Sequence, residues 1–388
     1  MSKITLTLQA VTPLFMSGAV STACEFRASG IKGSLRYWFR ALYPHLLSEE
    51  SSLFGSTELK SPLRIRTRDI NPRTIPTGDS RFHNAKLSYL GYGIIAWDRE
   101  QKKNVTTKAF FDVASMFDLE LMFSSKLNTE AQHRILSSLW CLFMFGGLGA
   151  RTRRGFGSLR ICDIHDSDRI LDDFPTFSFK NRTEWIQTIE KFLKRFCPNN
   201  DQTSHTAFSK DMRLIILPDQ ASSMVILNKI GENFQNFRSY RQGRQYPEDH
   251  DLIYNYLKYN KEPYRLPERS AFGLPHNYFF SSLDGKYVPN KCDVYNKDGG
   301  QPGRRSSPLF IHVQGFTNGM AGGAFLFLPA PFLKDKKKVT IVKKYDRFYR
   351  GPRDYTGIQL SPLDCSNFYS GVEKYLDHLL KTGGEEIT

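Results

Sequence analysis

GGLGARTRRGFGSL, residues 146–159, is the stretch that decides the fold, since it places five glycines and three arginines between two different periodic patterns. Residues 129–145 before it carry apolar side chains at helical spacing, and residues 158–162 alternate like a strand. Glycines let a backbone turn through positive φ and approach a ligand closely. The segment does not match G-x-x-x-x-G-K-S/T, and a predicted helix precedes it where a P-loop follows a strand. The P-loop of a nucleoside triphosphatase is therefore not indicated. It predicts a tight helix-to-strand connection with exposed backbone N–H groups.

The sequence before this loop supplies the rest of one compact unit. Ile4, Leu6 and Leu8 alternate with polar residues, which predicts a strand at the start. A helix is expected to begin near Ser29, a suitable N-cap residue. The further predicted elements are strands at 63–70, 87–97 and 110–123 and the helix at 129–145. This βαββαβ order is that of a ferredoxin-like unit, in which helices cover one face of an antiparallel sheet.

The second half gives weaker local signals. Polar residues predict a linker at 163–182 and a long surface insertion at 281–307. The predicted regular elements are helices at 185–196 and 367–380, a mostly helical region at 223–260, and strands at 212–217, 309–313 and 324–328. A degenerate second ferredoxin-like unit fits this order, although the local pattern alone does not establish it.

The charge balance points to a polyanionic partner. The chain of 388 residues has 54 Lys and Arg against 39 Asp and Glu, a formal net charge of +15. Neutralising phosphates with such cations releases condensed counterions, so nucleic acid is the favoured partner class. A membrane surface is not favoured, because neither end of the chain has an amphipathic basic helix. The six cysteines form no C-x-x-C pair, and the start of the chain has no secretory signal, so we expect a cytoplasmic protein.

Several basic residues are candidates for binding RNA, and each has a structural alternative. Arg151, Arg153 and Arg154 lie between the loop glycines, where they either bind phosphate oxygens or are solvated in a tight connection. Lys32, Arg36 and Arg40 are spaced by four along the first helix. Further candidates are Arg241 and Arg244, which are interleaved with tyrosines, and Arg304 and Arg305, which precede an apolar strand.

The sequence offers little for catalysis. The nine histidines form no H-E-x-x-H or H-x-H motif, and no acidic cluster is spaced for two metals. We therefore expect no catalytic residue, no metal, no cofactor and no small-molecule substrate. A metal-independent ribonuclease needs only an acid/base residue and some cations, so that class stays open as the alternative.

Several motifs in the sequence resemble those of a known family. LTLQAVTPLFMSGA (6–19), SGIKGSLRYWFRAL (29–42) and LFGS (53–56) resemble the opening of RAMP proteins in CRISPR effector complexes. The loop at 146–159 is similar to their glycine-rich loop. Together with the first helix and LFGS, the later FGLP (272–275) and RRSSPLF (304–310) make the chain resemble the first-numbered RAMP subunit of the Cmr, or type III-B, complex.

The resemblance implies an α+β chain with two ferredoxin-like modules. The expected domains are residues 1–165, with the glycine-rich loop, and residues 166–388, a degenerate module with helical insertions. It further implies a non-catalytic subunit that caps the filament and binds the 3′ region of the guide RNA and the paired target RNA, beside other Cmr subunits. The positions that match the family are Lys32, Arg36, Gly147, Gly149, Arg151, Arg153, Arg154 and Gly155. The alternative is a RAMP endoribonuclease that processes guide RNA precursors.

Overall fold

A computed structural model describes residues 2–20, 22–83, 85–197, 203–239, 247–298, 301–331, 333, 338–360 and 368–387. Its larger elements in the first part of the chain are β1 (Ser2–Ala10), α1 (Ala28–Leu42), α2 (Glu50–Phe54), β2 (Leu63–Asn71), β7 (Met116–Phe123), α3 (Thr129–Phe145), β8 (Leu159–His165) and α4 (Arg182–Phe196). Between β2 and β7 lie the short β3 (Thr74–Ile75), β4 (Ile95–Asp98), β5 (Lys103–Thr106) and β6 (Phe110–Phe111).

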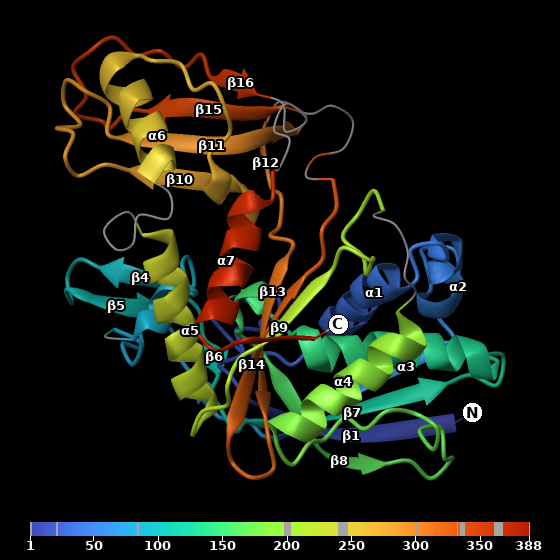
Figure 1. The fold of residues 1–388 in the computed structure, drawn as a ribbon. Helices are drawn as coiled ribbons and strands as arrows, with labels where there is room; N and C mark the ends of the chain where they lie inside the picture. Colours follow the sequence, from blue (N-terminus) through green and yellow to red (C-terminus); the bar gives the residue numbers. More distant parts are fainter. Residues whose placement is uncertain are drawn as a thin grey trace. The chain divides into compact units, whose positions relative to one another are not determined.

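The first sheet has the strand order β2-β7-β1-β8, and every pair in it is antiparallel. With α1 after β1 and α3 before β8, this is the predicted ferredoxin-like order. The alternating residues Ile4, Leu6 and Leu8 are fully buried under α1 and α3, which lie across one face of the sheet (Figure 1). The predicted helix at 129–145 is confirmed to the residue, and its N-cap Asn128 accepts a hydrogen bond from the Ala131 N–H.

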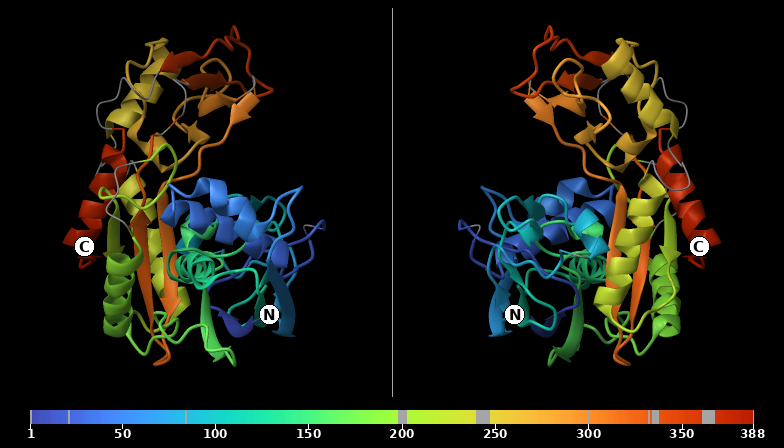
Figure 2. Two further views of the ribbon diagram at one scale, coloured as in Figure 1. Left: turned by 90° about the vertical axis from the view of Figure 1, so that its right-hand side faces the viewer. Right: turned by 90° about the vertical axis from the view of Figure 1, so that its left-hand side faces the viewer.

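The later elements form a second sheet with the same topology. They are β9 (Arg213–Ile216), α5 (Ser223–Arg238), β13 (Leu309–Gly315), β14 (Ala321–Phe327), α7 (Ser370–Lys381) and β17 (Glu385–Ile387). The strand order β13-β14-β9-β17 repeats the order of the first sheet, and Figure 2 shows the long β13–β14 hairpin. The fold is thus α+β with two ferredoxin-like sheets, and the second module is complete in its order of elements.

Two insertions interrupt the second module and form a third sheet. The inserted elements are α6 (Pro247–Tyr259), β10 (His276–Phe279), β11 (Lys291–Asp298), β12 (Gln301–Gly303), β15 (Val339–Lys344) and β16 (Ile358–Leu360). The strands pair in the order β10-β11-β15-β16, with β12 on β11. The insertion predicted at 281–307 lies within the first of these two insertions, and it contains the strands β11 and β12, which the sequence did not indicate. The predicted strand at 87–97 was wrong at its start, where residues 86–89 form a turn of 3₁₀ helix.

The chain divides into two compact units, each made of several stretches of sequence. The predicted domain boundary between residues 165 and 166 stays a prediction. Unit 1 comprises residues 1–233, 310–328 and 379–388, and unit 2 comprises residues 234–309 and 329–378. Both ferredoxin-like sheets belong to unit 1 because one hydrophobic core continues from the first to the second. Trp38 of α1 lies 5.3 Å from Phe310 of β13, between ring centroids, and Trp185 of α4 lies 5.8 Å from Phe316.

Unit 2 has a core of its own. The strands β11 and β15 contribute Val294, Val339 and Ile341, and α6 contributes Ile253 and Leu257. Figure 1 shows α6 lying across this sheet. None of the described helices has the length and apolarity required to cross a membrane.

Candidate RNA-binding site

The glycine-rich loop is held in one shape by close backbone packing. Gly149, Gly155 and Gly157 have φ of 83°, 82° and 69°, in the left-handed region that favours glycine. A Cβ on Gly157 would overlap the Leu148 carbonyl oxygen, and a Cβ on Gly147 would lie 2.9 Å from the Gly157 carbonyl oxygen. These glycines therefore allow the two limbs of the loop to run against each other, which is the tight connection that the sequence predicted.

The loop is also fastened to the segment that follows β1. The Ala150 N–H donates to the Phe15 carbonyl at 2.8 Å, and the Gly157 N–H donates to the Pro13 carbonyl at 3.0 Å. The buried Thr12 hydroxyl donates to the Gly155 carbonyl at 2.7 Å and accepts from the Ser158 N–H. Several loop N–H groups are thus used inside the chain, and the loop is rigid enough to present side chains in fixed positions.

A buried histidine supports the start of the loop. His312 of β13 lies with Nδ1 2.7 Å from the Gly146 carbonyl oxygen. Burial lowers the pKa of His312 to about 4, so the ring is neutral near pH 7 and its Nδ1–H donates to that carbonyl. The side chain is fully buried in this role, which makes it a structural residue of the loop.

The three loop arginines differ in their surroundings. Arg153 is half-buried, and its guanidinium lies 4.4 Å from the ring centroid of Phe310 and 5.2 Å from that of Tyr37. Stacking on two rings fixes a guanidinium in place. Arg154 is also half-buried, whereas Arg151 is exposed and has a left-handed φ of 62°. The arrangement places three cations within one short turn, residues 151–154 of unit 1, with Arg151 exposed and the other two half-buried.

The basic residues of α1, Lys32, Arg36 and Arg40, form the α1 ridge, and most of their hydrogen bonds and ion pairs are made within the chain. Arg36 pairs with Glu50 at 3.0 Å and donates to the carbonyls of Phe54 and Gly55, so it closes the end of α2. Lys32 donates to the Leu63 carbonyl at 3.2 Å, and burial, followed by the charge of Arg36, lowers the pKa of Lys32. Arg40 is more exposed and lies 3.5 Å from Glu50. RNA contact at these positions stays a prediction, and Arg40 is the one best placed for it.

The remaining predicted residues fall elsewhere. Arg241 and Arg244 lie outside the described residues. Arg304 is exposed in unit 2, and Arg305 is half-buried there, with its backbone bonded to Leu274 in both directions at 2.8 and 3.1 Å. The loop and the α1 ridge share unit 1, so the structure brings together only part of the predicted set.

One basic feature was missed in the sequence. Arg64, Arg66 and Arg68 alternate along the edge strand β2 and are all exposed, whereas the alternate positions Leu63, Ile65 and Thr67 are buried or half-buried. Strand alternation and the register with β7 put them on the sheet face opposite α1 and α3, and Arg68 pairs with Asp118 at 2.5 Å. The signal was the alternation R-x-R-x-R inside a strand already predicted at 63–70.

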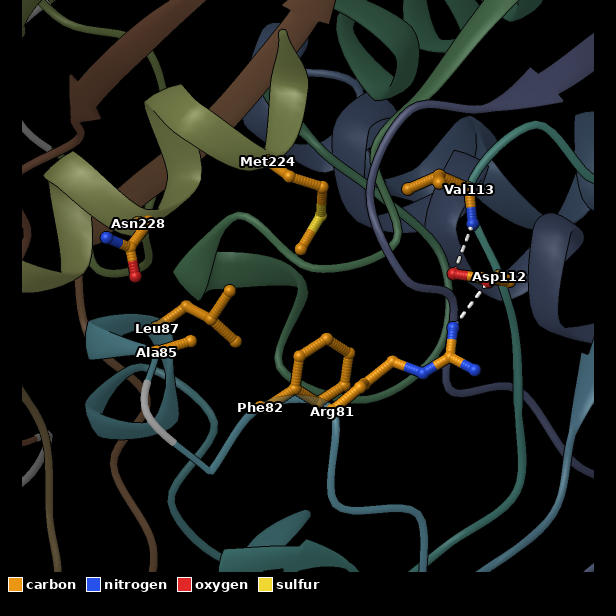
Figure 3. A pocket seen from close by; sticks show the side chains of 8 residues that line it. All are labelled: Arg81, Phe82, Ala85, Leu87, Asp112, Val113, Met224 and Asn228. Atoms are coloured by element: carbon orange, nitrogen blue, oxygen red, sulfur yellow. Dashed lines mark hydrogen bonds and ion pairs between the residues drawn. The ribbon is translucent and has the colours of Figure 1, made fainter.

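A cavity of about 380 Å³ lies near the loop in unit 1 (Figure 3). Phe82, Leu87 and Met224 face it, and an ion pair of 2.5 Å between Arg81 and Asp112 lies at one side. Mostly apolar walls with a few polar groups are typical of ligand sites.

Helix α5 connects this cavity to the loop. Met224 lines the cavity, and the nearby Leu227 packs so closely that a Cβ on Gly155 would lie 2.8 Å from its Cδ1 atom. Further along the helix, Gly231 lies directly against the backbone of Lys86. Among the described residues, no group of three or more His, Cys, Asp or Glu side chains is placed to hold a metal ion.

Comparisons with known proteins agree with this geometry. The model of the RAMP superfamily matches residues 7–160, which contain most of the first module and the loop. The CRISPR system Cmr subunit Cmr1-2 of Pyrococcus furiosus is 32% identical over 177 residues, covering 40% of this chain and 92% of the relative. Subunit Cmr1-1 of the same organism is 27% identical over 183 residues, covering 44% of this chain and half of the relative.

Solved structures show the same fold along the whole chain. The apo crystal structure of Cmr1 from Pyrococcus furiosus has a TM-score of 0.58 at 17% identity, covering 100% of this chain and 99% of the other. A chain of the type III-B Cmr-beta complex bound to cognate target RNA and AMPPnP has a TM-score of 0.53 at 13% identity, covering 98% and 99%. At these identities the likeness concerns the fold, while the sequence match to Cmr1-2 carries the relationship. The chain therefore belongs to the Cmr1 family of CRISPR-system Cmr subunits, within the RAMP superfamily.

Proposed function

We propose that this chain is a non-catalytic, RNA-binding subunit of a type III-B Cmr complex, and that the loop at 146–159 binds the RNA backbone. The observation that carries the proposal is the rigid loop with Arg151, Arg153 and Arg154 in one turn. A guanidinium held by ring stacking, as Arg153 is, loses little rotamer freedom when it binds a phosphate. The net charge of +15 adds long-range attraction for a polyanion.

In this proposal the chain caps the filament of Cmr subunits and contacts the 3′ region of the guide RNA together with the paired target RNA. Arg40 of α1 and the exposed arginines of β2 add further basic side chains to unit 1, on different faces of the first sheet. Contacts of this kind are to phosphates, so the protein accepts any guide sequence, as an RNA-guided complex requires.

The test is a triple variant in which Arg151, Arg153 and Arg154 are changed to Met, which keeps an unbranched apolar side chain and removes the charge. RNA affinity is measured with the full chain over a range of salt concentrations. Each phosphate contact to a single strand contributes about 0.7 to the slope of log K against log salt, so losing three contacts lowers the slope by about 2. The exposed Arg169, changed to Met, is the control and leaves the slope unchanged. Equal affinity and equal slope in the triple variant and the wild type would contradict the role of the loop.

The placement at the guide 3′ end has its own test. Complexes are purified from the native host and their guide RNAs are compared with and without the triple variant. Loss of protection confined to the guide 3′ region is expected, because the 5′ region is bound by other subunits in this proposal. Uniform shortening, or none, would oppose the placement.

The alternative, a metal-independent endoribonuclease, makes a different prediction. Purified chain incubated with labelled repeat RNA in the presence of a chelator yields no product if the chain is a binding subunit. A discrete cleavage product would favour the enzyme.

A further inference from the structure

Unit 2 contains a second cavity, of about 470 Å³, that has no part in the proposed loop site of unit 1. It lies among the end of α6, the residues around 287–289, the end of β15 and the segment 349–354. Four tyrosines line it: Tyr256, Tyr287, Tyr345 and Tyr349. Tyrosine rings combine a flat apolar face with a polar hydroxyl, so such walls suit a flat ligand with hydrogen-bonding edges.

A buried lysine forms part of this cavity. In β15, Val339 and Ile341 point into the core beneath α6, and strand alternation places Lys343 next on the same side. Lys343 is only 5% exposed, its ammonium donates to the side-chain oxygen of Asn260, and it lies 4.7 Å from the ring centroid of Tyr256. A charged group at a core position is costly unless it is well compensated. The ammonium contacts one amide oxygen and one ring face, and the charge of the Asp354 carboxylate favours its protonated form; all three groups belong to the cavity wall.

Other charged groups surround the cavity. Arg353 is exposed at its edge, and Lys258 lies over the rings of Tyr254 and Tyr259 at 5.3 and 5.1 Å. The carboxylates of Glu262 and Asp354 also line it. These carboxylates would repel a bare anion, but they can accept hydrogen bonds from amino or hydroxyl groups of a larger ligand.

We propose that this cavity binds a nucleotide, with the base stacked on the tyrosine rings and the phosphate held by Lys343 and Arg353. Base–aromatic stacking combined with cations is the recurrent way in which proteins hold an unpaired nucleotide. The carboxylates then bind the exocyclic amino groups or the ribose hydroxyls. Two sources share this chemistry, a free mononucleotide and the phosphorylated end of a single-stranded RNA. The site goes beyond the proposed function, because it lies in unit 2 and uses none of the loop residues.

The purely structural reading of Lys343 makes the opposite prediction. If Asn260 and Tyr256 only compensate a buried charge, replacing Lys343 with Met removes the charge, fills the same space and changes no ligand affinity. If the lysine binds phosphate, the same replacement removes a charged hydrogen bond, which reduces affinity by about tenfold or more.

Calorimetric titration of the full chain with AMP, UMP and inorganic phosphate tests the site. Wild type is expected to bind both mononucleotides more tightly than phosphate, and Lys343→Met to weaken nucleotide binding at least tenfold. Lys344→Met is the matched control, since Lys344 follows directly, is 55% exposed and pairs with Asp293 at 3.1 Å on the other side of β15. Arg353→Met, at an exposed position, replaces Lys343→Met if that variant does not fold.

The same titration with short single strands carrying a 5′-phosphate or a 5′-hydroxyl distinguishes the sources. A Lys343-dependent preference for the phosphorylated strand over AMP points to an RNA end, and the reverse points to a free nucleotide. The proposal is overturned if phosphate binds as tightly as the nucleotides, or if Lys343→Met and Arg353→Met both bind like wild type. It is equally overturned if Lys343→Met retains nucleotide affinity but loses co-purifying Cmr subunits, since the cavity would then be a protein interface. The triple variant of the loop arginines should leave nucleotide binding unchanged, so the cavity proposal and the proposed function of the loop can be refuted separately.

Discussion

His312 makes the stability of this protein depend on pH in a way that the structure fixes in sign and size. Its imidazole is fully buried on β13 and donates to the Gly146 carbonyl, with Nε2 3.5 Å from the side-chain oxygen of Gln314. Burial lowers its pKa to about 4, which outweighs the opposite effect of the Gly146 and Gln314 oxygens, since both would accept hydrogen bonds from the protonated ring. In the unfolded chain a histidine titrates near 6.5.

Between these two pKa values the unfolded state binds the additional proton, so the free energy of unfolding rises with pH in this range. The stabilisation from His312 is fully present above about pH 6.5 and is lost as the pH falls toward the folded pKa of about 4. Integrating the proton linkage from pH 7 to pH 5 gives a loss of about 2 kcal/mol from this one group.

Urea unfolding of wild type and His312→Asn at pH 7 and pH 5 measures the effect. Asn keeps an amide donor for the Gly146 carbonyl and does not titrate, so the variant should lack about 2 kcal/mol of the pH dependence of wild type. The exposed His45, changed to Asn, is the control and should keep the wild-type dependence. Parallel pH dependences of wild type and His312→Asn would refute the assignment of a buried neutral imidazole.

Three further substitutions test other parts of the structure by chemical unfolding. Gly157→Ala should destabilise the chain by about 3 kcal/mol or more, because the new methyl overlaps the Leu148 carbonyl at a left-handed φ; a change below about 1 kcal/mol would contradict this packing. Arg36→Met should cost about 2 kcal/mol by removing the charged donor that closes α2, and wild-type stability would show that these bonds are dispensable. Asp249→Asn should cost about 3 kcal/mol, because the buried carboxylate pairs with Arg265 at 3.0 Å; an unchanged unfolding midpoint would argue against that pair.

The first module was predictable from sequence because its signals are local. The apolar spacing of residues 129–145 spans the whole of α3, and the alternation of Ile4, Leu6 and Leu8 defines one face of β1. The glycine-rich loop was likewise found from composition, since left-handed φ and close backbone contacts select glycine.

The partners of charged side chains could not be found in this way. The spacing of Arg36 on α1 shows only that its side chain lies off the apolar face of the helix. Its bonds to Glu50 and Phe54 depend on how residues 50–55 fold back against α1. The third sheet escaped prediction for a related reason. Strands β11 and β15 pair across two separate insertions, so their stability comes from a distant partner that no local pattern reports.

The pairing of β9 has a consequence for how the chain folds during its synthesis. Ile216 is paired with Ala324 on one side and Glu385 on the other, while the first sheet is complete once residue 165 has been made. Leu214, Ile215 and Ile216, all fully buried at the end, therefore leave the ribosome long before either neighbouring strand exists. Such late pairing slows folding and exposes an apolar edge to other chains. The first module shares its core with the second sheet, so it can bury Leu214 and Ile216 of β9 before the neighbouring strands are made.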